Sequence, residues 1–186
     1  MNEIAVRRLQ VIFESQDTCV DFVEPTDIYS LVAVYNSHPA FLTQHLQRKT
    51  VTYGWLTDEI KIMRNAGFLS CKVVGKASGA IHGLIDVKIA VETYLSLLMI
   101  HQDSTNQGLG QQVYTALEAY VRRQGCRTIR IDVITGYSDR VLNFWRRNGF
   151  HVVEDATLNW DGVRLPAVIL KKRVSGICDG SLTFPC

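Results

Sequence analysis

Two glycines that follow a polar run are the clearest sign of chemistry in this chain of 186 residues. Gly108 and Gly110 come directly after the polar residues 101–107. Residues 95–100, before them, are almost all apolar, which predicts a strand covered on both faces. A glycine loop between a buried strand and a helix brings exposed backbone N–H groups and the positive end of a helix to one point. The sequence therefore predicts a site for the phosphate groups of a cofactor.

The segments after this loop predict the elements that hold it in place. Residues 109–125 carry apolar side chains at helical spacing and end at a glycine, and residues 127–135 alternate as a strand does. A strand, helix, strand order makes the two strands parallel. A shorter helix is expected over residues 138–148, and closing strands over residues 151–160 and 163–171.

The segments before the loop predict further strands and helices. Residues 5–14 and 18–23 have the composition of strands, and residues 26–36 place their apolar side chains on one helical face. Residues 37–53 mix a proline, polar residues and isolated apolar ones, which predicts an irregular segment or a broken helix, exposed enough to form part of a substrate cleft. A second helix is expected over residues 57–67, with Thr57 as its cap.

Composition limits the class of protein. The length and the 47% of hydrophobic residues predict one domain over residues 1–174 and a flexible tail over residues 175–186. A net charge of +2 with interspersed signs argues against a nucleic-acid binder. No apolar run is long enough for a membrane helix, and the N-terminus lacks a signal peptide, so we expect a cytoplasmic protein. The five cysteines contain no C-x-x-C pair and the histidines show no ligand spacing, so no metal is expected.

From about residue 5 to residue 173, the chain resembles the GNAT superfamily of N-acetyltransferases. The family signature R/Q-x-x-G-x-G/A corresponds to residues 105–110, which read TNQGLG. A second family pattern, N-x-x-A-x-x-F-Y-x-x-x-G-F, corresponds to Ser138, Val141, Phe144, Trp145, Gly149 and Phe150. The resemblance implies an α/β (α+β) GNAT fold. In that fold, about four helices flank a mixed, mostly antiparallel sheet of six to seven strands, with a parallel splayed pair at the fourth and fifth strands.

The resemblance also implies acetyl transfer from acetyl-CoA to a primary amine by direct attack. In the family, the backbone of the fourth strand holds the pantetheine arm and the glycine loop binds the pyrophosphate. Carried over to this chain, the cofactor-binding residues are Leu98, Met99, Ile100, Thr105, Asn106, Gln107, Gly108, Leu109, Gly110, Gln111, Ser138 and Trp145. The implied acceptor is a small-molecule amine, and homodimers are common in the family.

Three positions depart from the family pattern. Thr105 stands where Arg or Gln is usual, which removes a long side-chain contact to phosphate and leaves the backbone contacts. Ser138 replaces an Asn and could donate one hydrogen bond or cap its helix. Trp145 replaces a Tyr that often protonates the leaving thiolate, and an indole N–H is too weakly acidic for that step. The general acid is therefore unassigned.

The acceptor amine needs a base that removes its proton. Glu92, at the start of the predicted fourth strand, is the first candidate, because some family members keep a glutamate there. Asp86, on the polar face of the second arm of a hairpin predicted over residues 68–92, is the second. For each, the alternative is an ordinary solvated or ion-paired carboxylate. For His101, a structural hydrogen bond is favoured over catalysis.

Other functions remain open at this point. Thr105 and Trp145 also fit a module that binds acyl-CoA with little or no catalysis. A dinucleotide-binding fold is disfavoured, because Val113 stands where its motif needs a third glycine. A polyamine, an aminoglycoside, an amino acid or a protein amine would each fit the sequence as acceptor.

Overall fold

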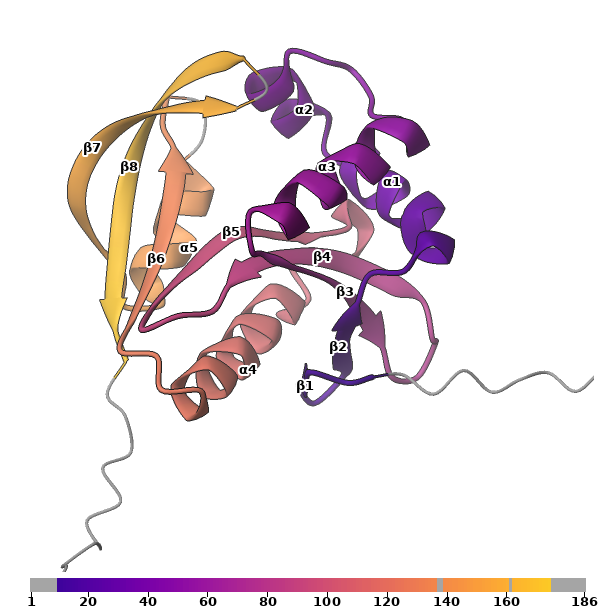
Figure 1. Cartoon of the computed structure of the whole chain (residues 1–186), viewed down its shortest axis with the longest axis horizontal. Helices are drawn as coiled ribbons and strands as arrows, with labels where there is room; N and C mark the ends of the chain where they lie inside the picture. The colour runs from indigo at the N-terminus through magenta and orange to yellow at the C-terminus, as the bar shows by residue number, and fades with distance from the viewer. Residues whose placement is uncertain (1–9, 137–138, 161, 175–186) are drawn as a thin grey trace, which may run out of the picture.

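One mixed sheet of eight strands, in the order β1-β2-β3-β4-β5-β6-β8-β7, runs through the molecule (Figure 1). The computed structural model describes residues 10–136, 139–160 and 162–174. All neighbouring strands are antiparallel except β5 and β6, which are parallel. The strands are β1 (Phe13–Glu14), β2 (Thr18–Phe22), β3 (Leu69–Gly75), β4 (Ile81–Lys88), β5 (Glu92–Ile100), β6 (Thr128–Ile134), β7 (His151–Trp160) and β8 (Val163–Arg173).

Helices cover both faces of the sheet, and each face has its own hydrophobic cluster. Three helices pack against β4 and β5 on one face, and the long helix α4 packs against the other (Figure 1). Within the described residues the α-helices are α1 (Ile28–Asn36), α2 (Pro39–Leu46), α3 (Tyr53–Asn65), α4 (Leu109–Arg123) and α5 (Asp139–Arg147). Two short 3-10 helices, η1 (Pro25–Asp27) and η2 (Gln102–Ser104), precede α1 and α4. No helix among the described residues is both long and apolar enough to cross a membrane.

The strand, helix, strand unit around α4 is the part of the fold that the sequence predicts best. Val113, Leu117 and Val121 are fully buried on one face of α4, as their helical spacing requires. The helix carries the chain from the end of β5 back to the start of β6, so the two strands run in the same direction. The predicted GNAT fold with its parallel pair is confirmed.

Pairing between β5 and β6 stops soon after it begins. Glu92 to Tyr94 pair with Thr128 to Arg130, and the ladder ends there. Beyond this point β6 is paired only with β8, and β5 only with β4, over the described residues. The two parallel strands therefore splay apart, and each leaves one backbone edge facing the gap. We call this space the β5–β6 gap.

The prediction was wrong in several details. There are more strands and helices than the six to seven strands and about four helices expected. Residues 37–53, expected to be irregular or a broken helix, do contain a short helix, α2, which starts at Pro39 because proline fits the first helical position without losing a hydrogen bond. Helix α3 begins at Tyr53 instead of Thr57, because the Thr52 hydroxyl caps it by accepting from the Trp55 N–H at 3.3 Å.

Two further predictions fall partly or wholly outside the described residues. Of the strand expected over residues 5–14, residues 10–14 are described, and only Phe13–Glu14 forms β1. Ser138 and the tail at 175–186 lie outside the described residues.

Candidate active site

A β-bulge in β5 lies next to the β5–β6 gap. Asp86 of β4 lies opposite Leu97 and Val87 lies opposite Leu95, so Ser96 is an extra residue in β5. Leu95 packs with the cluster under α4, whereas Leu97 packs with the cluster under α1 and α3. The bulge therefore changes which face each later side chain of β5 occupies.

Beyond the bulge, the backbone of β5 offers alternate groups to the gap. The His101 N–H donates to the His82 carbonyl at 2.7 Å, which fixes the alternation of the β4–β5 ladder. By that alternation the N–H and C=O of Met99 face β4, and those of Leu98 and Ile100 face the gap. Of the three β5 residues expected to hold pantetheine, two thus present backbone groups to the gap.

The junction between α1 and α2 is fastened to the end of β5. The Nε2–H of His38 donates to the Ile100 carbonyl at 2.6 Å, and because a carbonyl only accepts, this contact fixes the tautomer of the ring. Burial lowers the pKa of His38, so the imidazole is neutral at pH 7. The Ser37 hydroxyl accepts from the Gln102 N–H at 3.0 Å, which ties the same junction to η2.

The loop before α4 holds a run of unpaired backbone donors. Asn106 and Gly108 adopt left-handed conformations, with φ of 61° and 79°, and α4 begins at the next residue. Within the described part of the chain, the N–H groups of residues 106–111 make no hydrogen bond. Successive N–H groups at the start of a helix form a site that suits an anion. The loop thus has the geometry that a pyrophosphate requires.

The side chains of this loop serve mainly to hold its shape. The Thr105 hydroxyl donates to the Gln102 carbonyl at 2.7 Å, and the Gln107 amide donates to the Asp103 carbonyl at 3.0 Å. Both contacts are with η2, so the donor run is braced before any ligand binds. The Thr105 hydroxyl is therefore engaged in a hydrogen bond that stabilises the loop itself.

Arg140, in the first turn of α5, brings a cation to the loop. Its guanidinium donates to the Asn106 side-chain carbonyl at 2.9 Å, and the residue is exposed. Arg140 was not predicted from the sequence, although a basic residue two positions after Ser138 in the second family pattern was a visible signal. Arg140 stands close to where the family has a long polar side chain at position 105.

Trp145 lies in an aromatic cluster between α4 and α5. It is 7% exposed, and its ring makes edge contacts with Tyr114 and Phe150, both at 5.3 Å between centroids. The Tyr114 hydroxyl donates to Glu118, and burial together with that carboxylate raises the pKa of Tyr114 far above its usual value. Neither ring is placed or charged to act as a general acid, and that role stays unassigned.

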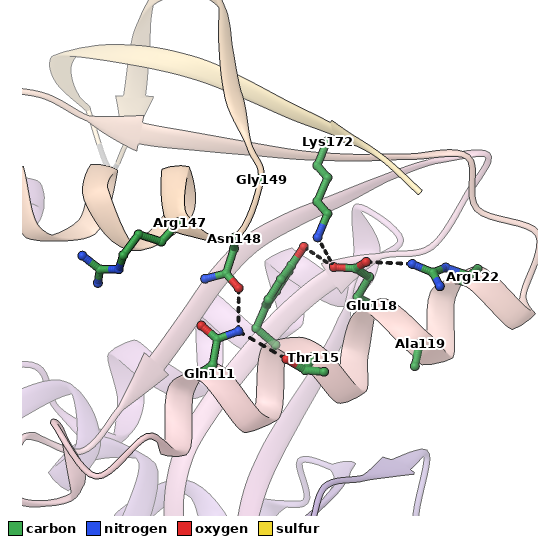
Figure 2. Close-up of a pocket in the computed structure, with 10 residues that line it drawn as sticks. Gln111, Thr115, Glu118, Ala119, Arg122, Arg147, Asn148, Gly149 and Lys172 are labelled. Carbon is green, nitrogen blue, oxygen red and sulfur yellow. Dashed lines mark hydrogen bonds and ion pairs between the residues drawn. The ribbon is translucent and has the colours of Figure 1, made fainter. Parts of the chain in front are cut away.

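A groove of about 520 Å³ runs beside α4, starting from the donor loop (Figure 2). Gln111 lies at its start and donates to the Asn148 side chain at 2.6 Å. Further along, Glu118 accepts from Lys172 and Arg122, and Figure 2 shows Arg147 pointing away from this cluster. The groove is lined by Gln111, Tyr114, Thr115, Glu118, Ala119, Arg122, Arg147, Asn148, Gly149 and Lys172.

Asp86 is a buried carboxyl group close to the bulge. It is 4% exposed and accepts a hydrogen bond from the Ser70 hydroxyl at 2.5 Å. Burial raises the pKa of Asp86 to about 7, and the Ser70 hydrogen bond opposes that rise only in part. Asp86 lies on the α1–α3 face of the sheet, because it alternates with the buried Leu84 of that cluster. A carboxyl with such a pKa can accept a proton near neutral pH.

Glu92 lies in a different part of the molecule. It is the first residue of β5, at the closed end of the gap, and β5 ends with Ile100 at the open end. Its carboxylate forms an ion pair with Lys171 at 2.6 Å. The structure does not bring Glu92 near the donor loop or Asp86.

His101 forms a local structural contact. Its Nδ1 accepts from the Asp103 N–H at 3.2 Å, so the ring caps η2. Among the described residues, no group of three or more His, Cys, Asp or Glu side chains could hold a metal ion.

The family of the chain follows from its sequence. Residues 31–150 match the model of the acetyltransferase (GNAT) family, which covers most of the elements around the gap and the donor loop. The chain therefore belongs to the GNAT acetyltransferase family. No curated protein matches the chain by sequence.

Solved structures share the fold at low identity. An acetyltransferase from Thermus thermophilus is 20% identical, with a TM-score of 0.67 over 86% of this chain and 99% of its own. The ribosomal-protein-S18-alanine N-acetyltransferase from Escherichia coli is 15% identical, with a TM-score of 0.65 over 89% and 99%. A protein from Salmonella typhimurium, solved with its cofactor acetyl-CoA, is 12% identical, with a TM-score of 0.62 over 89% and 99%. At these identities the likeness shows the fold alone.

Proposed function

We propose that this protein transfers an acetyl group from acetyl-CoA to a primary amine. The observation that carries the proposal is the run of unpaired donors at residues 106–111, which follows directly from the open edge of β5. A phosphate site that directly follows an open strand edge suits a long ligand that carries both a pyrophosphate and amide groups. Acetyl-CoA has both.

Specific residues of this chain would hold the coenzyme. The N–H groups of residues 106–111 and the Arg140 guanidinium would bind the pyrophosphate, and the backbone of Leu98 and Ile100 would bind the pantetheine amides. Bound there, the coenzyme supplies an acetyl thioester, whose thiolate is a tolerable leaving group because a free thiol has a pKa of ~8.5. Ser138 and Trp145 stay in the proposal as neighbours of the pantetheine.

The groove in Figure 2 is the proposed place for the nucleotide end of the coenzyme. It starts at Gln111, the last residue of the donor run, so a ligand that leaves the loop can continue into it. Arg147 also lines the groove and, unlike Arg122 and Lys172, does not pair with Glu118, so this carboxylate does not offset its positive charge. Anionic groups of a nucleotide would be stabilised there.

The acceptor amine would approach from the α1–α3 face, because the donor loop and α4 occupy the other. Between the two carboxylates, we propose Asp86 as the base, acting through water, since it lies on that face beside the bulge. Its pKa of about 7 suits proton removal near neutral pH. An N–H of β5 at Leu98 would polarise the carbonyl during direct attack by the amine. The ion pair with Lys171 makes Glu92 the weaker candidate.

The test is thiol release from acetyl-CoA with a panel of amines, for the wild type, Asp86→Asn and Glu92→Gln. We expect Asp86→Asn to lose at least 100-fold in kcat and to lose the rise of kcat/KM as the pH increases through about 7. Glu92→Gln should stay within threefold. The pKa of Asp86 is raised from 3.8 to about 7 in the native state, so ionisation of this carboxyl destabilises the fold increasingly between these two pH values. Asp86→Asn should therefore be more stable than the wild type at pH 8.

That gain in stability separates lost chemistry from lost folding. A large loss in Glu92→Gln with none in Asp86→Asn would reverse the assignment. Tight binding of acetyl-CoA without thiol release for any amine would support the binding module in place of the enzyme.

A further inference from the structure

A second cavity, of about 270 Å³, borders the donor loop. Gln107 and Leu109 of the loop form one wall, and His82 of β4 forms another together with the turn between β3 and β4. A side chain that borders a cavity packs against fewer atoms on that side. The shape of the loop therefore depends more heavily on the hydrogen bonds around the cavity.

A β-bulge lies in β4 at His82. In the β3–β4 ladder, Val73 pairs with Gly83 and the next residue of β3 pairs with Ile81, so His82 is an extra residue in β4. Its ring lies close to Gly75, where an added Cβ would come within 2.8 Å of the Nε2 atom. Glycine at position 75 therefore leaves the room that the ring occupies.

His82 holds η2 at two points. Its carbonyl accepts from the His101 N–H at 2.7 Å, just before η2 begins. Its Nδ1 is hydrogen-bonded to the hydroxyl of Ser104, the last residue of η2, at 3.0 Å. A hydroxyl can donate or accept, so this contact forms with either neutral tautomer of the ring. The other ring nitrogen lies 3.4 Å from the Ser78 hydroxyl, so the ring joins η2 to the turn between β3 and β4.

From η2 this support continues into the donor run. The Thr105 hydroxyl and the Gln107 amide both donate to carbonyls of η2. After the run, Gln112 near the start of α4 donates to Asp17 at 2.9 Å. The run thus lies between two anchored points, and His82 fixes the one that precedes it.

We infer that His82 is a positioning residue for the coenzyme, which sets the affinity for acetyl-CoA by holding the donor loop through Ser104. The inference rests on the proposed function. Donors that are fixed before binding lose less freedom when the ligand binds, so the affinity rises without a new contact to the ligand. His82 lines a cavity with residues of α4, whereas Asp86 lies on the opposite face of the sheet. Loss of His82 should therefore weaken coenzyme binding and leave the chemical step unchanged.

The experiment is a double-mutant cycle on acetyl-CoA affinity, measured by calorimetry with the full chain. We expect the Kd to rise at least fivefold in His82→Ala and in Ser104→Ala, because each substitution removes the same hydrogen bond. The double variant should bind no more than twofold more weakly than the weaker of the two single variants. At saturating acetyl-CoA, kcat and the KM for the amine should stay within twofold of the wild type in all three variants.

Two further variants serve as controls. His82→Asn places an amide group close to the position of Nδ1, which keeps a partner for the Ser104 hydroxyl, and its Kd should stay within twofold of the wild type. Ser78→Ala removes the hydroxyl beside the other ring nitrogen, which faces the turn instead of η2, and should behave in the same way.

Hydrogen exchange of the free protein follows the loop without the coenzyme. The N–H groups of Ser104 and Thr105 donate to the carbonyls of His101 and Gln102, at 2.9 and 3.1 Å. Their exchange should be at least fivefold faster in His82→Ala and in Ser104→Ala than in the wild type. Exchange within residues 113–121 of α4 should not change, which shows that the variants are folded.

The outcomes separate this positioning role from the proposed reaction. An unchanged Kd in His82→Ala, a loss in Ser104→Ala alone, or losses that add in the double variant would overturn the inference and leave the reaction standing. A wild-type protein that does not bind acetyl-CoA would overturn the proposed function. In that case, hydrogen exchange decides on His82: faster exchange at Ser104 and Thr105 in both single variants supports its hold on the loop, and unchanged exchange overturns it.

Discussion

Gly108 is the residue on which the donor loop depends most directly. Its φ of 79° is a conformation that other residues rarely adopt, and it aims the following N–H groups away from the chain. A Cβ added there would meet nothing within 4 Å, so a side chain would act through backbone strain and not through a clash. The orientation of the loop therefore rests on this conformation.

We expect Gly108→Val to weaken acetyl-CoA binding at least tenfold, because the strained residue shifts the donors that follow it. The cost to stability should be about 1–3 kcal/mol. Gly125→Val is a matched control at the far end of α4, where φ is 83° and a Cβ also meets nothing within 4 Å. Calorimetry with acetyl-CoA and chemical unfolding of both variants make the comparison. Equal affinity in the two variants would contradict the role given to the loop.

Single functional residues can be predicted from the sequence when the pattern that marks them lies within one short stretch. The change from an apolar strand to polar residues and two glycines lies within one stretch, so the donor loop could be predicted from the sequence alone. Arg140 contacts this loop because the chain folds α5 against α4, and a tertiary contact of that kind leaves no periodic pattern in the sequence. The same holds for the Ser70 hydroxyl that meets Asp86.

Among the elements, α4 and α2 show opposite degrees of predictability. Helix α4 buries one regular stripe, so its spacing alone identified it. Helix α2 has only eight residues, and its buried Leu42, His45 and Leu46 make an apolar stripe of a single turn, which is too short to identify a helix from spacing. It also packs on Trp160, which is far away in the sequence. Short helices held by tertiary packing are the elements that a pattern misses.

His38, just before α2, and His45, within it, make this element sensitive to acid. Burial lowers the pKa of both His38 and His45, and the nearby His101 adds to the effect on His38. A group whose native pKa is lowered favours folding above its unfolded value of 6.5, and that contribution is lost as the pH falls. Protonation should therefore loosen α2 as the pH falls below 6.5.

Hydrogen exchange at pH 7.5 and pH 5.5, corrected for intrinsic rates, tests this expectation. Protection of residues 39–46 should fall at least tenfold more than protection of α3 (Tyr53–Asn65) between the two pH values. The double variant His38→Gln, His45→Gln should lose this difference, because glutamine does not titrate. Parallel behaviour of α2 and α3 in the wild type would contradict the assignment.

For the whole molecule, the β5–β6 gap divides the sheet into two parts. The first five strands form one part and β6, β8 and β7 form the other, and in the sheet itself only Glu92 to Tyr94 and Thr128 to Arg130 join them within the described residues. At the last of these pairs the Tyr94 hydroxyl donates to Asp132 at 3.0 Å, and Arg130 holds the same carboxylate with two hydrogen bonds of 2.9 Å. This link spans the two parts where they begin to separate.

The link should matter most when the gap contains no coenzyme. Burial and the Asp132 charge raise the pKa of Tyr94 to about 12, so its hydroxyl is a neutral donor at every working pH. Tyr94→Phe removes the hydroxyl and leaves Asp132 paired with Arg130, so we expect a loss of about 1 kcal/mol in the free energy of unfolding. A ligand at 100 times its Kd adds ~2.7 kcal/mol to the native state. If acetyl-CoA contacts both strands of the gap, it replaces part of the lost link.

Urea unfolding with and without acetyl-CoA therefore tests whether the coenzyme bridges the two parts of the sheet. The deficit of Tyr94→Phe should shrink by at least half when both proteins are compared at the same saturating concentration of acetyl-CoA, because the variant then binds the coenzyme more tightly than the wild type. Tyr120→Phe is the control. Tyr120 lies in α4 and stacks on Phe13 of β1, and its hydroxyl makes no hydrogen bond among the described residues. A deficit that is the same with and without coenzyme would mean that the ligand does not bridge the two parts. The gap would then not be its binding slot, and the proposal for the coenzyme would fail at the level of the whole fold.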